Sequence, residues 1–302
     1  MTVAMTLPTS PEPTLRFTLS SGRSIAADGF GDPHDQPVLF LHGGGQTRHA
    51  WAGSAEALSR LGFYAITMDH RGHGDSDWAG RGEYAMGHFG DDLEEVAAQL
   101  ARKPIMVGAS LGGLSILSAE QASASPVAKA LVLVDISPRM ELAGVTRIVG
   151  FMQDANDGFA SLEEAADAIA AYQPHRKREK NLAGLAKNLR RREDGRYRWH
   201  WDPNVLEFWD PSRQGGEDHQ EENIRERLEA AARIDAPVLL IRGRMSDVLS
   251  EEAAAEFLRF VPHATYVDLA DAAHMVAGDR NDVFTESVAT FILEHVDPRI
   301  DS

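Results

Sequence analysis

The sequence of 302 residues contains no cysteine, so disulfides, thiolate metal sites and cysteine-based catalysis are excluded together. It also lacks an apolar run long enough to cross a bilayer. Residues 1–14 have neither the basic start nor the apolar stretch of a signal peptide. We therefore expect a cytoplasmic protein that does not engage membranes.

Positive charge is scarce. Lys and Arg total 30 against 46 Asp and Glu, which gives a formal net charge of -16. This charge repels phosphate backbones and anionic lipid surfaces, so nucleic acid is not an expected partner. Apolar residues make up 43% and charged residues 25% of the chain, and both values are ordinary for a globular protein.

Short, almost wholly apolar runs recur along the chain, as in strands that are buried on both faces of a parallel sheet. They cover residues 37–41, 63–68, 104–107, 130–134, 237–241 and 265–269. Stretches with apolar positions at helical spacing separate them, at residues 50–61, 90–102, 111–121, 251–260 and 282–295. A hairpin of residues 15–19 and 23–27 is expected to precede them. This alternation predicts an α/β fold with a mostly parallel central sheet and helices on both faces.

The alternation stops between residues 137 and 233, where charged helical patterns and aromatic clusters replace the buried strand runs. We interpret this part as a helical cap that is inserted into the α/β domain. The predicted organisation is a flexible tail at residues 1–14, a core at 15–136 and 234–302, and a helical cap at 137–233.

The run Gly108-Ala109-Ser110-Leu111-Gly112 follows an expected strand and precedes an expected helix. This is the G-x-S-x-G arrangement in a strand-turn-helix context, which presents a serine hydroxyl on a strained turn. The flanking glycines let the backbones approach one another closely. The sequence therefore predicts Ser110 as a nucleophile.

Two further motifs come directly after expected strands: HGGG at residues 42–45 and DHRGHGDS at residues 69–76. Together with the serine turn, they resemble the α/β-hydrolase superfamily over residues 15–296 outside the cap. The resemblance implies an oxyanion hole formed by the backbone N–H groups of Gly44 and Leu111. It also implies a structural role for residues 69–76, so that His70 and His73 are hydrogen-bonded loop residues rather than metal ligands.

The order Ser, Asp, His in this family implies an acid after a late strand and a histidine after the next strand. Asp247, in a loop that resembles the family's G-x-x-S-D, and His274 occupy these two places. His274 is then the general base for Ser110, and Asp247 orients its ring. Asp135, at the end of the strand at 130–134, is the alternative acid because some members of the superfamily carry the carboxylate there; we favour Asp247.

Ser110 argues against the haloalkane dehalogenases and epoxide hydrolases of this fold, which have an aspartate at that position. The resemblance implies a serine hydrolase of the carboxylesterase type that needs no metal and no organic cofactor. Its expected substrate is a small to medium ester, uncharged or monoanionic, with an apolar portion. C–C bond hydrolases, lactonases and perhydrolases share the triad and stay open, as do a ligand receptor with a slow hydrolytic site and a homodimeric state.

Substrate choice is expected to lie in the cap. Its aromatic side chains either line an apolar pocket or form the core of the cap, and the sequence does not separate the two. The candidates are Phe151, Trp199, Trp201, Phe208 and Trp209.

Overall fold

The computed structural model describes residues 11–154, 157–174, 178, 182–209, 217–270, 272–274 and 281–296. Over these residues the main sheet has eight strands in the order β1-β2-β4-β3-β5-β6-β9-β10. The strands are β1 (Leu15–Thr18), β2 (Ser24–Phe30), β3 (Gln36–Leu41), β4 (Phe63–Met68), β5 (Ile105–Ala109), β6 (Ala130–Val134), β9 (Val238–Gly243) and β10 (Thr265–Leu269). β2 pairs antiparallel with β1 and β4, and all later neighbours are parallel. The predicted fold class is confirmed.

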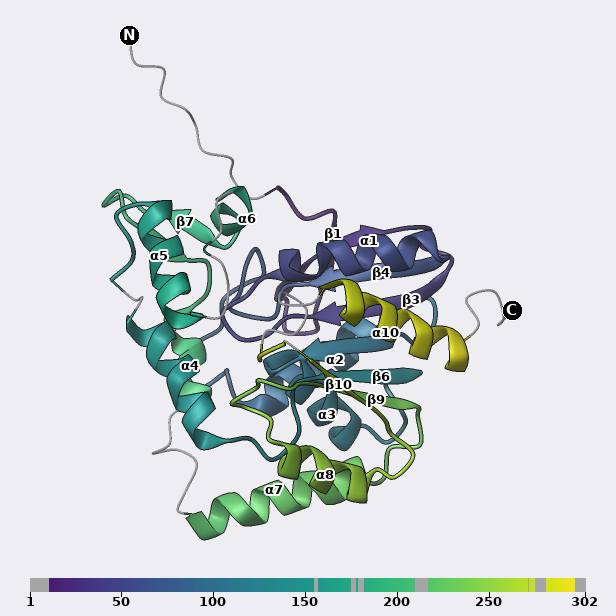
Figure 1. The fold of residues 1–302 in the computed structure, drawn as a ribbon. Helices are drawn as coiled ribbons and strands as arrows, with labels where there is room; N and C mark the ends of the chain where they lie inside the picture. The colour runs from purple at the N-terminus through teal and green to yellow at the C-terminus, as the bar shows by residue number, and fades with distance from the viewer. Residues whose placement is uncertain are drawn as a thin grey trace.

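Helices cover both faces of the sheet (Figure 1). α1 (Ala52–Arg60) and α10 (Asn281–His295) pack on one face, with the short 3-10 helix η1 (Arg48–Trp51) before α1. The other face carries α2 (Met86–Ala98), α3 (Leu111–Ala122), α7 (Glu217–Ala231) and α8 (Glu251–Phe260). β3 is buried at every position because its side chains alternate between two covered faces. No helix of the described residues has the length and apolar character that a membrane span requires.

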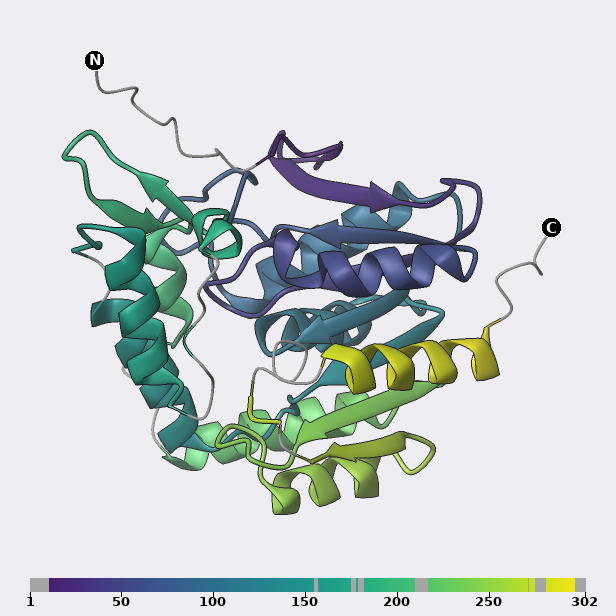
Figure 2. The same ribbon diagram turned by 45° about the horizontal axis from the view of Figure 1, so that its top comes forward.

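The cap lies across one end of the sheet, as both views show (Figure 1, Figure 2). It contains α4 (Leu142–Asp154), α5 (Leu162–Tyr172), α6 (Ala183–Ala186), the antiparallel pair β7 (Leu189–Arg191) and β8 (Tyr197–Trp199), and η2 (Pro203–Trp209). A small apolar cluster of its own, which includes Phe159, Leu162 and Leu189, holds α5 against the hairpin. The sequence suggested a helical cap, whereas the cap in the structure also contains the β7–β8 hairpin.

The packing of α7 (Glu217–Ala231) bears on where the cap ends, which the sequence placed at residue 233. α7 lies within the range assigned to the cap, but its Leu228 and Ala231 are buried in the same cluster as Leu240 of β9 and Phe257 of α8. The sequence of α7 is mostly charged because only a narrow stripe of this helix faces the core. The main core cluster therefore includes residues of α7, which the sequence assigned to the cap.

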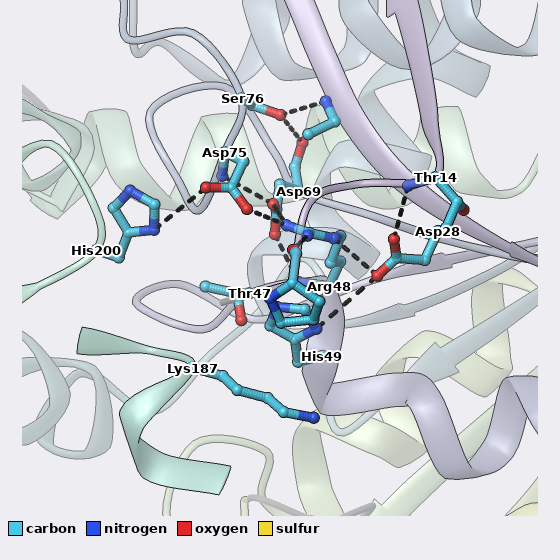
Figure 3. Close-up of polar contacts among 12 residues, drawn as sticks. Thr14, Asp28, Thr47, Arg48, His49, Asp69, Asp75, Ser76, Lys187 and His200 are labelled. Atoms are coloured by element: carbon cyan, nitrogen blue, oxygen red, sulfur yellow. Dashed lines mark hydrogen bonds and ion pairs between the residues drawn. The ribbon is translucent and has the colours of Figure 1, made fainter. Parts of the chain in front are cut away.

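Arg48, the first residue of η1, is fully buried. Its guanidinium donates to Asp28 at 2.9 Å, Asp69 at 2.6 Å and Asp75 at 2.7 Å (Figure 3). It also donates to the carbonyl of Pro11 at 2.8 Å. Asp69 is fully buried as well. A charge in this position is tolerated because carboxylates surround it, and burial of either partner alone costs several kcal/mol.

The same cluster reaches the cap. Asp75 pairs with Arg190 of β7 at 3.1 Å. It also lies 3.9 Å from Nδ1 of His200, which follows β8 (Figure 3). The N–H of Gly74 donates to the carbonyl of His200 at 2.7 Å. Gly74 has a φ of 54°, and the carboxylate of Asp69 fills the space that a Cβ would need. Residues 69–76 thus join the core to the cap.

We expect an Arg48→Met variant to lose about 3–5 kcal/mol of unfolding free energy, because it leaves the carboxylate of Asp69 buried without a counter-charge. Arg60→Met is the control, since Arg60 forms an exposed pair with Glu56 that is worth at most about 0.5 kcal/mol. Urea denaturation at neutral pH measures both variants. Equal losses in the two variants would show that the buried cluster does not stabilise the fold.

Candidate active site

Ser110 lies at the junction of β5 and α3 with a φ of 48° and a ψ of -114°, a conformation that residues with a side chain rarely adopt. Two glycines allow this turn. A Cβ on Gly108 would lie 2.5 Å from the carbonyl carbon of Gly112, and a Cβ on Gly112 would overlap the backbone of Leu41 in β3. The close approach of β5, α3 and β3 therefore requires glycine on both sides of Ser110.

His274 follows β10, and its Nδ1 lies 2.7 Å from Oδ2 of Asp135. Asp135 is fully buried at the end of β6, the strand beside β5. The N–H of Gly243 donates to its Oδ1 at 2.8 Å, and the hydroxyl of Ser246 donates to its Oδ2 at 2.5 Å. These contacts fix the carboxylate, and the carboxylate in turn fixes the ring of His274 through its Nδ1.

The structure places Asp135 against His274 and does not bring Asp247, the predicted acid, to this ring. The carboxylate of Asp247 instead pairs with Arg147 of α4, whose Nε and Nη2 lie 2.8 Å and 2.7 Å from its Oδ2. The local reason is Ser246, whose hydroxyl bonds Asp135 and also accepts from the N–H groups two and three residues further on. This turn directs the next side chain outwards, so that Asp247 is 39% exposed and faces the cap.

The glycines of residues 43–45 lie beside Ser110, with the Cβ position of Gly43 3.6 Å from Cβ of the serine. The N–H of Gly43 donates to Oε1 of Gln46 at 3.0 Å, and the N–H of Gly45 donates to Nε2 of His73 at 3.2 Å. No residue in the described part of the chain accepts from the N–H of Gly44, which lies between them. Gly44 is therefore the member of the triple glycine that can donate to a substrate.

Leu111 is the first residue of α3, so no preceding helical turn accepts its N–H. It follows Ser110 directly and is fully buried. A negatively charged oxygen near this helix start is also favoured by the partial positive charge of a helix N-terminus. Both predicted oxyanion donors, Gly44 and Leu111, are thus in suitable local settings.

Three buried histidines lie close together beside the glycine loop, and the rings of His42 and His73 bond to it. Burial lowers the pKa of His42 to about 4, that of His73 to about 3, and that of His70 well below its ordinary value. The Nδ1 of His73 donates to the carbonyl of Arg71 at 3.0 Å, which leaves Nε2 as the acceptor for Gly45. The neutral state of His73 is therefore what holds this end of the loop.

A cavity of about 380 Å³ opens at Ser110, His274 and the triple glycine. Most of its wall is apolar and comes from the cap: Val145, Ile148, Val149, Met152, Ile169 and Leu185. Of the predicted substrate-binding residues, Phe151, Trp199 and Trp201 line this cavity, whereas the side chains of Phe208 and Trp209 lie outside the described residues. No Asp, Glu, Lys or Arg stands among its described lining residues.

Sequence reasoning missed part of this wall. Tyr172, Gln173 and Asn188 also line the cavity, and Arg147 holds the backbone of Tyr172. None of these residues belongs to a motif, and single polar residues at the end of an amphipathic helix carry no pattern that marks a site. For Asp135 a signal was present, because the residue directly follows a wholly apolar strand next to the strand that leads to Ser110.

A family model described as the alpha/beta hydrolase fold matches residues 36–280. The chain is similar to the esterase Rv0045c of Mycobacterium tuberculosis, with 30% identity over 83% of this chain and 80% of the relative. It is also similar to a 3-hydroxybutyrate-oligomer hydrolase of Cupriavidus necator, with 28% identity over 81% of this chain and 85% of the relative. A solved structure of the Mycobacterium tuberculosis esterase superposes with a TM-score of 0.71 and 26% identity over 94% of this chain and 93% of the other.

The rate at which Ser110 is labelled distinguishes the two candidate acids, Asp135 and Asp247. We expect Asp135→Asn to slow the labelling of Ser110 by a fluorophosphonate by about four orders of magnitude, because the base loses the group that sets its tautomer. Asp247→Asn is the matched control and should label within a few-fold of the unmodified protein. Time-resolved labelling followed by mass spectrometry measures both rates. A slow Asp247→Asn beside a fast Asp135→Asn would reverse the assignment.

The buried His73 predicts a pH dependence of stability. Its pKa is about 3 in the folded protein and about 6.5 when unfolded, so acidification below pH 6.5 protonates the unfolded chain first and weakens folding. His73→Gln keeps an acceptor and should reduce this slope between pH 6 and 4 by up to about 1.4 kcal/mol per pH unit. Urea denaturation at several pH values tests this, with the exposed His34→Gln as control. An unchanged slope in His73→Gln would show that this ring does not carry the effect.

Proposed function

Because this chain belongs to the α/β-hydrolase family, we propose that it hydrolyses a carboxylic ester through an acyl-enzyme on Ser110. His274 is the general base, and Asp135 orients it. The observation that carries this proposal is the contact of 2.7 Å between His274 and the fully buried Asp135, at the cavity that Ser110 lines. A serine hydroxyl is a weak nucleophile near neutral pH and needs such a base.

The reaction follows from these positions. The Oγ of Ser110 attacks the carbonyl carbon of the ester while Nε2 of His274 accepts the hydroxyl proton. The carbon–oxygen bond to the alcohol then breaks, and the alcohol leaves with that proton. Water next attacks the acyl-enzyme, again with His274 as base, and releases the carboxylic acid and free Ser110. Asp135 stabilises the charged ring in both halves and does not itself take the proton.

The N–H groups of Gly44 and Leu111 are proposed to bind the oxyanion of each tetrahedral intermediate. The neighbouring amides of Gly43 and Gly45 are already engaged, which holds the loop and leaves the central amide for this task. A donor that is fixed before the reaction stabilises the developing charge without reorganisation, and one such donor lowers the activation barrier by about 3 kcal/mol.

The cavity favours an uncharged substrate with an apolar acyl group of small to medium size. Its wall is mainly aliphatic and aromatic, and besides Ser110, Tyr172 and His274 its polar side chains include the amides of Gln46, Gln173 and Asn188. The net charge of -16 further disfavours polyanionic substrates at long range. The names of two similar proteins, an esterase and an ester-oligomer hydrolase, support ester cleavage as the reaction.

We expect steady-state turnover of p-nitrophenyl esters with short to medium acyl chains, and a loss of at least about four orders of magnitude in kcat for Ser110→Ala. The release of p-nitrophenol is followed by absorbance, and fluorophosphonate labelling counts active sites. Labelling with fewer than one turnover per site would indicate a ligand receptor with a residual hydrolytic site. Turnover of lactones or vinylogous diketones but not of esters would indicate one of the sister reactions.

A further inference from the structure

Two side chains of the cap line two cavities at once. Phe151 of α4 and Tyr172 of α5 line the cavity that contains Ser110, and both also line a second cavity of about 420 Å³ between α4 and α5. Their rings stack with centroids 4.3 Å apart and planes inclined by 15°. The stacked pair therefore stands between an inner cavity, which contains Ser110, and an outer one, which does not.

The outer cavity offers an apolar continuation of the inner one. Phe159, Ala168 and Ala171 line it, together with Gly150. Its charged members are Arg147 and Asp154. A linear chain that passed the stacked rings would therefore continue to contact mainly apolar surface.

A series of contacts connects the stacked pair to the loop after β9 in the core. Arg147 lies over the ring of Tyr172 at 4.8 Å from its centroid and donates to the carbonyl of Tyr172 at 3.2 Å. The same guanidinium pairs with Asp247, in the loop after β9. Gly144 of α4 packs so tightly on the carbonyl of Asp247 that no side chain fits there. The position of the rings thus depends on a residue of the catalytic core.

We propose that the stacked rings of Phe151 and Tyr172 form the wall that limits the length of the acyl chain, and that Arg147 and Asp247 position this wall. The inference rests on the proposed esterase function and adds the determinant of its substrate length. Asp247 thus influences the length of acyl chain that the site accepts by positioning residues of the cap. The acyl chain bound to Ser110 ends at the rings.

The test is the profile of kcat/KM against acyl length for p-nitrophenyl esters from acetate to dodecanoate. The unmodified protein should show a cut-off, beyond which added methylenes lower kcat/KM. In Phe151→Ala, and independently in Tyr172→Ala, the cut-off should move to longer chains, with a gain of about fourfold for each methylene that enters the outer cavity. Val149→Ala is the control, because Val149 lines only the inner cavity, and it should leave the cut-off in place.

Asp247→Asn tests the positioning role. It should relax the cut-off in the same direction to a smaller extent, with an effect on kcat/KM that grows with chain length, whereas a general structural defect would lower all esters alike. Thermal melting verifies that each variant is folded. A folded Phe151→Ala or Tyr172→Ala variant that keeps the original cut-off would show that the rings do not limit the acyl length. An unchanged profile in Asp247→Asn would show that Asp247 does not position them.

A second readout separates this inference from the proposed function. Binding of linear methyl ketones of increasing length, followed by quenching of tryptophan fluorescence, reports the cavity through Trp199 and Trp201 without turnover. If no ester is hydrolysed but the ketones show a length limit that Phe151→Ala relaxes, the proposed esterase function is wrong and the rings still limit the chain length. If esters are hydrolysed and neither series responds to Phe151→Ala, the wall fails and the function stands.

Discussion

The geometry of the site depends on the hydrogen bonds of the buried carboxylate of Asp135. It lies at the end of β6 and binds the amide of Gly243 at the end of β9, the hydroxyl of Ser246 and the ring of His274. One side chain thereby joins β6, the turn after β9 and the loop after β10. Among the described residues, this carboxylate is the partner that fixes the orientation of the His274 ring, on which the proposed role of His274 as base for Ser110 depends.

Much of this arrangement follows from the sequence, for identifiable reasons. Strands that are buried on both faces must be apolar throughout, so β3, β5, β6 and β9 are visible as short runs. The serine turn is visible because close approach of three backbones demands glycine at fixed positions. These are local requirements, and local requirements leave patterns in a sequence.

The choice between Asp135 and Asp247 is not local. Both residues follow buried strands, and both have a hydroxyl residue within two positions. What decides between them is the direction in which the turn after β9 points Asp247, and this depends on the bonds of Ser246 and on Arg147, which lies one hundred residues away in the chain. The limits of the cap escaped prediction for a similar reason, since a helix that buries only a narrow stripe, such as α7, has the composition of an exposed helix.

The junction of the cap with residues 69–76 has a consequence for engineering. His200 and Trp201 of the cap pair with Gly74 and His73 of that segment, and His73 holds the amide of Gly45 beside Gly44, the proposed oxyanion donor. An exchange of the cap with that of a relative would therefore alter the geometry of catalysis as well as the shape of the pocket. A chimaera that aims to change substrate alone has to retain residues 200–201 together with the segment that they contact.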